Sequence, residues 1–138
     1  MTGEKIMIVD DNESLLEELR EILDCSGYSA VTVSDPNTAC ETARVVLPDV
    51  ILLDLKMGAM NGFHVAEALK QSSFTAGIPI IAMSGYFPVD DGNSLLDASR
   101  MEACLKKPFG ILDMLGAIEK VLCNARKSES EAEIADKD

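Results

Sequence analysis

Three short apolar runs constrain the fold of this chain more than any other feature of its sequence. They are Ile6–Val9, Val50–Leu53 and Ile78–Met83. A strand with one face in water alternates apolar and polar residues, whereas a strand covered on both faces is apolar throughout. The runs therefore predict central strands of a parallel sheet. Two weaker strands fit at Ser29–Val33 and Ala103–Leu105.

Apolar residues between these strands recur at helical spacing and predict five helices. The positions that carry the helices are Leu15, Leu16, Leu19, Ile22 and Leu23; Ala39, Ala43 and Val46; Phe63, Ala66 and Leu69; Leu95, Leu96 and Met101; and Ile111, Leu112, Leu115, Ile118 and Leu122. Strands that alternate with helices over short connections predict an α/β fold. We expect a doubly wound, five-stranded parallel sheet with helices on both faces.

Length and composition indicate a single domain. The chain has 138 residues, of which 47% are hydrophobic, and this is enough for one core. The sequence becomes polar and charged from Asn124 onward. We therefore expect one domain over residues 1–124 and a charged tail over residues 125–138, which is either a helical extension or disordered.

The charge of the chain narrows the possible partners. Asp and Glu number 24 against 12 Lys and Arg, for a net charge of −12. Such a surface repels nucleic-acid phosphates, so we expect no direct nucleic-acid binding. The apolar runs are far shorter than the ~20 residues of a membrane span, and the first residues do not resemble a signal peptide. We expect a cytoplasmic protein without membrane association.

The cysteines do not form a recognisable metal-binding pattern. Cys25, Cys40, Cys104 and Cys123 include no CxxC pair, and His64 is the single histidine. This spacing is unlike that of a zinc site. Because free cysteine is often buried, we expect four reduced thiols that mostly face the core.

Polar residues occur where the predicted strands end. Asp10 and Asp11 follow the first strand, and Asp54 follows the third. Ser84 ends the fourth strand, and Lys107 lies just after the fifth. Ligand sites in open α/β sheets form at the carboxyl ends of the strands. We therefore expect these five side chains to converge at one edge of the sheet.

This combination of groups suits phosphoryl transfer. Neighbouring carboxylates repel one another, but a divalent cation among them lets all of them stay ionised. Ligand sets made only of oxygen favour Mg²⁺ or Mn²⁺. A carboxylate beside such a metal can accept a phosphoryl group and form an acyl phosphate. The metal, the lysine ammonium and the serine hydroxyl would then stabilise the oxygens of the transferred group.

The segments around these residues resemble the CheY-like receiver domains of two-component response regulators. The similarity covers residues 4–123. It implies a flavodoxin-like sheet with strand order 2-1-3-4-5. The motifs that carry it are Ile6–Asp11, Pro48–Asp54, Met57–Gly62, Ile78–Ser84 and Lys107–Phe109.

The resemblance implies a metal-binding acceptor site. Asp54 corresponds to the residue that accepts the phosphoryl group. Asp11 corresponds to a direct Mg²⁺ ligand and Asp10 to one that acts largely through water. Asp54 and the backbone carbonyl of Lys56 complete the implied ligand set.

The resemblance also implies two partners for the phosphoryl group. Ser84 corresponds to the hydroxyl that switches position, and Lys107 to the phosphate-binding lysine. Lys106 is the weaker choice because the family lysine directly precedes the proline. The Lys107–Pro108 bond corresponds to one that is usually cis in the family, although most X–Pro bonds are trans.

Two positions depart from the family pattern. Gly58 stands at a position in the loop after the acceptor where the family usually has proline. The glycine gives this loop more conformational freedom. Cys104 stands where an aromatic ring often turns inward when the switch hydroxyl moves. A thiol cannot report the switch in the same way.

We therefore expect a stand-alone receiver that accepts a phosphoryl group on Asp54 from a histidine kinase or a phosphotransfer protein. The reaction should require Mg²⁺ and should change the binding of a partner protein. The only catalysis expected is that of its own phosphorylation and dephosphorylation.

Three alternatives use related folds. The first is a binding module of the same fold that functions without phosphorylation. The second is a phosphatase or phosphotransferase with an Asp nucleophile, which usually needs a general acid two residues after the nucleophile, where this chain has Lys56. The third is a flavodoxin-like flavin protein, which would need a Ser/Thr/Gly-rich loop in place of Asp10–Glu13.

The lifetime of the phosphorylated state yields a testable prediction. Hydrolysis needs a water in line with the phosphorus, and the resemblance places Lys56 and Tyr86 beside that approach. A long cationic chain and a bulky ring should obstruct it, so we predict a half-life of minutes to hours. The alternative is that both side chains point to solvent and the hydrolysis rate is ordinary. The measurement is phosphate loss from Asp54 in the wild type and in a Lys56→Asn/Tyr86→Glu variant, which should lose phosphate faster. Loss within seconds in the wild type, or equal rates, would contradict the prediction.

Overall fold

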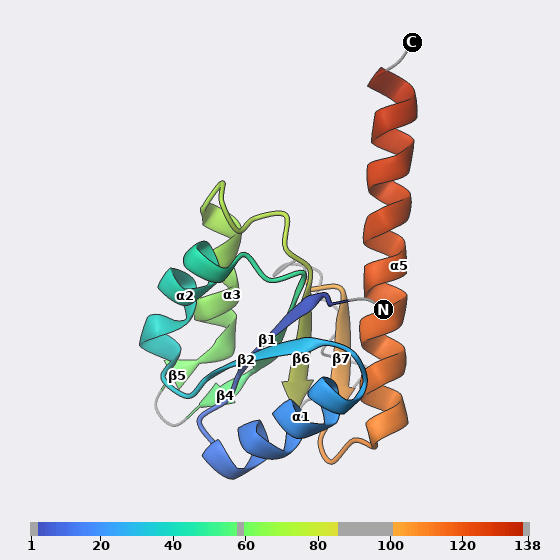
Figure 1. Cartoon of the computed structure of the whole chain (residues 1–138). Coiled ribbons are helices and arrows are strands. Elements are labelled where there is room, and N and C mark those ends of the chain that lie inside the picture. Colours follow the sequence, from blue (N-terminus) through green and yellow to red (C-terminus); the bar gives the residue numbers. More distant parts are fainter. Residues whose placement is uncertain (1–2, 58–59, 86–100, 137–138) are drawn as a thin grey trace.

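Five parallel strands form the central sheet of the computed structural model, which describes residues 3–57, 60–85 and 101–136. The neighbours in the sheet are β2-β1-β3-β6-β7 (Figure 1). The strands are β1 (Lys5–Val9), β2 (Ser29–Val33), β3 (Val50–Asp54), β6 (Ile80–Ser84) and β7 (Ala103–Lys106). All five predicted strands are therefore present.

The predicted strand order is also confirmed. Two short strands, β4 (Lys56–Met57) and β5 (Met60–Asn61), form a separate antiparallel hairpin. When the hairpin is left out of the numbering, the order of the sheet is 2-1-3-4-5. The fourth strand of this sheet begins at Ile80 rather than at Ile78, because Pro79 has no N–H to donate to a neighbouring strand.

Four α-helices are described, and they cover both faces of the sheet (Figure 1). They are α1 (Glu13–Cys25), α2 (Ala39–Val46), α3 (Gly62–Gln71) and α5 (Ile111–Asp136). A short 3-10 turn, Pro36–Thr38, precedes α2. The predicted helix around Leu95 and Leu96 lies outside the described residues.

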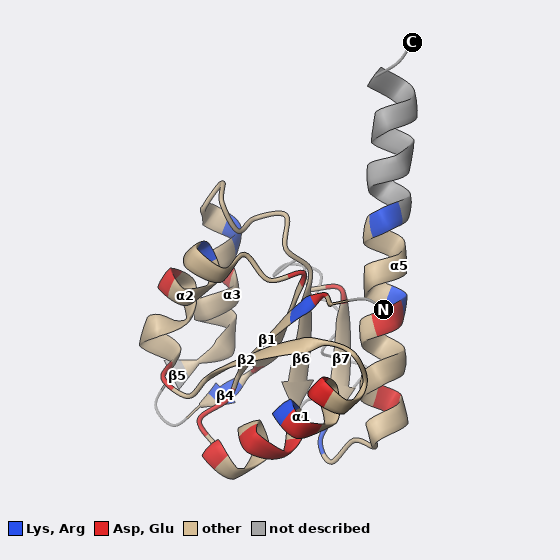
Figure 2. Cartoon of the chain, in the orientation of Figure 1, with Lys and Arg blue, Asp and Glu red and all other residues tan. Residues whose placement is uncertain are grey.

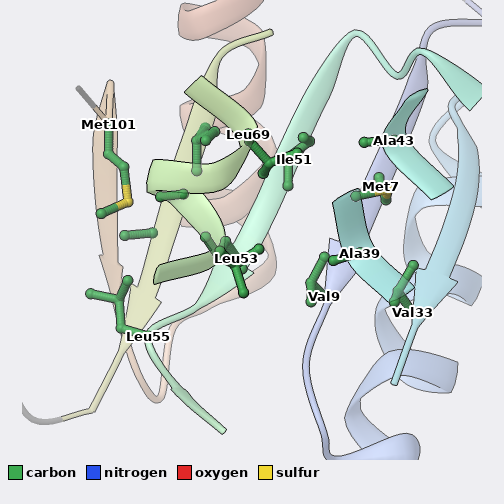
Figure 3. Packing of buried hydrophobic residues seen from close by; sticks show 14 of the residues in the cluster. Met7, Val9, Val33, Ala39, Ala43, Ile51, Leu53, Leu55, Leu69 and Met101 are labelled. Atoms are coloured by element: carbon green, nitrogen blue, oxygen red, sulfur yellow. The ribbon is translucent and has the colours of Figure 1, made fainter. Parts of the chain in front are cut away.

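The core lies on both faces of the sheet because successive side chains of a buried strand point in opposite directions. Met7 and Val9 pack with residues of α2 and α3, a cluster that Figure 3 shows from close by. Ile6 and Ile8 pack with residues of α1 and α5 on the other face. All four side chains are fully buried. The continuous apolar character of the first run therefore reflects two separate helix layers.

Helix α5 continues without a break through the predicted boundary at residues 124 and 125. Its C-terminal part extends away from the sheet (Figure 1). The Arg126 guanidinium pairs with the carboxylate of Glu4, next to the start of β1. The division into residues 1–124 and residues 125–138 stays a prediction. Within the described residues, no helix is both long enough and apolar enough to cross a membrane.

The prediction that most cysteines face the core is wrong. All four thiols are free, but Cys25, Cys104 and Cys123 are exposed and Cys40 is only partly buried. Cys25 is the last residue of α1, and Cys123 follows two buried residues on the solvent side of α5. Cys104 points outward because it alternates along β7 with the buried Leu105.

The Lys70 side chain, which is 6% exposed, ties α3 to the turn that precedes β6. Its ammonium donates to the carbonyl oxygens of Ala76 at 3.2 Å and Ile78 at 3.0 Å. It also lies 4.0 Å from a carboxylate oxygen of Glu102. The second oxygen of that carboxylate accepts the N–H of Ile80, so one network holds the starts of β6 and β7.

We predict that Lys70→Met lowers the free energy of unfolding by roughly 1–3 kcal/mol, because two carbonyls and a carboxylate lose a buried donor. Urea unfolding measures the change. Lys120→Met, at an exposed position of α5, is the control and should stay within about 0.5 kcal/mol of wild type. Equal stability of the two variants would show that the Lys70 network does not stabilise the fold.

Candidate functional site

The strand order brings the predicted site residues to one edge of the sheet. Asp10 directly follows β1, and Asp54 ends the neighbouring strand β3. Ser84 ends β6, and Lys107 comes one residue after β7. The backbone N–H of Lys107 donates to the carbonyl of Ser84 at 2.8 Å. Parallel pairing therefore aligns the carboxyl ends of four strands.

The ammonium of Lys107 lies between two buried carboxylates. It is 2.7 Å from Asp10 Oδ2 and 3.5 Å from Asp54 Oδ1. Asp10 is 0% exposed and Asp54 is 5% exposed. The neighbouring Lys106 is exposed. Of the two lysines before the proline, Lys107 is the one in contact with the acidic residues, and its bond to Pro108 is cis, as the resemblance implied.

Backbone amides orient both carboxylates. The N–H of Asn12 donates to Asp10 Oδ1 at 2.9 Å, and the N–H of Lys56 donates to Asp54 Oδ1 at 3.3 Å. The side chain of Asn12 in turn accepts the N–H of Leu15 and caps α1. Asn12 therefore both caps α1 and orients Asp10. The sequence did not lead us to predict this contact between Asn12 and Asp10. The asparagine directly before a helical pattern was a signal for the cap, whereas the contact with Asp10 uses a backbone N–H that any residue except proline supplies.

Three carboxylates could hold a divalent cation at this edge. Ligand oxygens of Asp10, Asp11 and Asp54 all lie within 4.8 Å of one another, and Asp11 is exposed to solvent. A set of carboxylate oxygens with access to water suits Mg²⁺, which keeps several of its own waters when bound. The donor set therefore fits the metal that the sequence predicted.

Burial and neighbouring charges shift the pKa values of Asp54 and Lys107. Burial raises the pKa of Asp54, and the carboxylate of Asp10 raises it further, which outweighs the opposing effect of Lys107. Burial alone would lower the pKa of Lys107. The hydrogen bond to Asp10 and the charges of Asp10 and Asp54 outweigh it, so this pKa is raised. The lysine therefore keeps its positive charge, whereas the charge on Asp54 is disfavoured until a cation compensates it.

The structure describes three of the remaining predicted residues. Ser84 is 5% exposed and lies at the same edge as Asp54. The side chain of Lys56 is exposed just after the acceptor strand, and the position of its carbonyl as a ligand stays a prediction. Cys104 is exposed on β7. Gly58 and Tyr86 lie outside the described residues.

Acidic side chains also gather beside this edge. Figure 2 shows acidic residues along α1, which begins at Glu13, and all five of them are exposed. They are Glu13, Glu17, Glu18, Glu21 and Asp24. The surface on the α1 side of the site is therefore negative.

Comparison with known proteins is consistent with this geometry. Residues 6–119 match the family described as response regulator receiver domain. The polar-differentiation response regulator DivK of Brucella anthropi is 28% identical over 120 residues, which are 87% of this chain and 97% of DivK.

Solved structures show the same fold. The chemotaxis protein CheY4 of Vibrio cholerae superposes with a TM-score of 0.80 at 26% identity, over 87% of this chain and 99% of that chain. A CheY-like receiver domain protein from Methanospirillum hungatei has a TM-score of 0.83 at 22% identity, over 92% and 99% of the two chains.

We predict that Asp54→Asn stabilises the metal-free protein at neutral pH by roughly 1 kcal/mol, because it removes a disfavoured buried charge. A carboxyl group with a raised folded-state pKa contributes stability below its unfolded pKa and loses it as pH rises through the folded pKa. The advantage of the variant should therefore be absent in acid and grow as Asp54 ionises.

Urea unfolding with EDTA over a series of pH values measures this difference. Asp24→Asn, at an exposed position, is the control and should change stability by about 0.5 kcal/mol or less. An Asp54→Asn variant that is less stable than wild type at neutral pH would contradict the prediction.

Proposed function

The chain belongs to the response-regulator receiver-domain family, and from this premise we propose that it accepts a phosphoryl group on Asp54 in a reaction that requires Mg²⁺. The phosphodonor in this proposal is a histidine kinase or a phosphotransfer protein in the cytoplasm. The observation that carries it is the position of the Lys107 ammonium, in contact with both Asp10 and Asp54 at a buried edge of the sheet.

In this proposal Asp54 is the nucleophile. One of its carboxylate oxygens attacks the phosphorus of the donor's phosphohistidine, the P–N bond breaks, the imidazole of the donor leaves, and Asp54 carries an acyl phosphate. The backbone N–H of Lys56, which donates to Oδ1, holds the carboxylate in place for the attack. Because Asp54 is nearly buried, little water competes for the transferred group.

Lys107 supplies positive charge beside the oxygen of Asp54 that would receive the negatively charged phosphoryl group. Its ammonium is 3.5 Å from Asp54 Oδ1 before any reaction. A short shift would let it pair with a phosphoryl oxygen attached to Asp54. Phosphorylation adds about −1.5 to −2 charges at neutral pH, and the permanent positive charge of Lys107 offsets part of it.

Asp10, Asp11, Asp54 and the carbonyl of Lys56 would hold the Mg²⁺ ion. When bound, the ion neutralises carboxylate charge and stabilises the equatorial oxygens of the transferred group. The close approach of the three carboxylates supports this assignment.

In this proposal Ser84 contacts the phosphoryl group after its transfer to Asp54. Its hydroxyl lies at the end of β6, in the strand beside the acceptor. Movement of this hydroxyl toward a phosphoryl oxygen would shift the segment that follows it, and a partner protein would bind the changed surface. Since Cys104 replaces the usual aromatic residue, this surface would have to be altered without an inward-turning ring.

The experiment is phosphorylation by acetyl phosphate followed by intact-protein mass spectrometry. We expect the wild type with Mg²⁺ to gain the mass of one phosphoryl group and the Asp54→Asn variant to gain none. EDTA should abolish the reaction because the carboxylate cluster then lacks its cation. Asp49→Asn, which alters an exposed carboxylate at the other end of β3, is the control and should react as wild type.

Two results would overturn the proposal. Labelling that persists in Asp54→Asn would identify a different acceptor. A wild type that gains no mass from acetyl phosphate and does not bind a beryllofluoride mimic with Mg²⁺ would instead support a binding module that functions without phosphorylation.

A further inference from the structure

Helix α3 begins in direct contact with the backbone that carries the acceptor residue. Gly62 is its first residue and is buried. A Cβ atom at this position would lie 2.2 Å from the carbonyl oxygen of Asp54 and 2.7 Å from Cα of Leu55. Both neighbours are backbone atoms, which cannot move aside as the end of a flexible side chain can. Any other residue here must therefore displace either the helix or the Asp54–Leu55 peptide.

The requirement for glycine comes from space rather than from backbone conformation. The described glycines in the left-handed region of φ are Gly3 and Gly27, and Gly62 is not among them. An alanine at position 62 could thus adopt the backbone angles of a helix start, but its methyl group would overlap the acceptor strand. By contrast, a Cβ at Gly116, within α5, would meet no atom within 4 Å other than those of its chain neighbours and of its own helix backbone.

A short series of contacts connects Gly62 to the carboxylate of Asp54. The N–H of Gly62 donates to the carbonyl of Leu55 at 2.9 Å. The preceding residue, Asn61, pairs with Lys56 in the β4–β5 hairpin and accepts the N–H of Phe63 as the cap of α3. Lys56 then donates its N–H to Asp54 Oδ1 at 3.3 Å. The start of α3 and the hairpin together fix the backbone on both sides of Leu55.

We propose that Gly62 is a positioning residue: its missing side chain lets the start of α3 abut the Asp54–Leu55 peptide, which sets the orientation of the Asp54 carboxylate and of the Lys56 backbone. As a statement about reaction rate, this inference rests on the proposed phosphorylation of Asp54. As a statement about geometry, it concerns only the Lys56 amide and the carboxylate that it contacts.

The first test is the Gly62→Ala variant. Displacement of a reacting group by about 1 Å can lower a rate ~100-fold, so we expect phosphorylation by acetyl phosphate to slow by roughly 10- to 100-fold. The backbone amide resonance of Lys56 should shift in the metal-free protein. Mg²⁺ affinity, followed by calorimetry without a phosphodonor, should fall several-fold because Asp54 and the Lys56 carbonyl are both displaced.

Two controls separate positioning from general destabilisation. Val65→Ala removes a buried side chain of the same helix without adding an atom near Asp54. Gly116→Ala adds the same methyl group where space is open. Both should keep the wild-type rate per folded molecule, the wild-type Lys56 resonance and the wild-type Mg²⁺ affinity. If Gly62→Ala loses stability but matches Val65→Ala in these three readouts, the proposal is overturned.

A second variant keeps the proposal testable if Gly62→Ala does not fold. Asn61→Ala retains the glycine but removes the cap that holds the first turn of α3. We expect it to shift the Lys56 amide and to lower the phosphorylation rate several-fold. A Lys56 amide and a rate equal to those of wild type would overturn the proposal.

The two proposals fail in different ways. If Asp54 is not the acceptor, the wild type is unlabelled, while the Lys56 resonance and the Mg²⁺ affinity still respond to Gly62→Ala. If Gly62 does not position the site, the wild type is labelled normally and the variant differs only in stability.

Discussion

The site depends on a partly buried contact between one ammonium and two carboxylates at the carboxyl edge of the sheet. Lys107 pairs with Asp10 at 2.7 Å and lies 3.5 Å from Asp54, at a point where both acids are almost inaccessible to solvent. Burial and the neighbouring carboxylate of Asp10 raise the pKa of Asp54, and the single positive charge of Lys107 does not compensate for both. A divalent cation or a protonated carboxyl group would restore the balance. The site thus has a physical reason to bind metal before any phosphoryl group arrives.

The surrounding fold holds these charges where they can interact. Helix layers on both faces exclude water from the strands, so the strand ends form a partly desolvated edge where charge interactions are strong. Backbone N–H groups of Asn12 and Lys56 then fix the two acids individually. The absence of a side chain at Gly62 allows α3 to approach the acceptor strand closely. The charged groups that suit phosphoryl transfer are costly to bury, so the site lowers the stability of the folded protein.

Most of the sheet was predictable because local sequence carries the relevant signal. Apolar runs such as Val50–Leu53 identify strands that are covered on both faces, and helical periodicity identifies α1, α2, α3 and α5. The thiols were predicted less well. Composition favours burial for cysteine, but the direction of Cys104 depends on which face of β7 it occupies. That direction follows from pairing with β6, which a single segment of sequence does not specify.

The sequence by itself determined which chemical groups this protein possesses and at which strand ends they occur, because strand ends and helix starts are local features. Only the tertiary structure decided which of these groups touch. The family resemblance favoured Lys107 over Lys106, and the structure shows that, of these two lysines, Lys107 contacts Asp10, which is distant in the sequence. Likewise, Gly62 resembles an ordinary helix start until the backbone of Asp54 is seen against it. Contacts between distant segments depend on sheet register and helix packing, and those are properties of the whole fold.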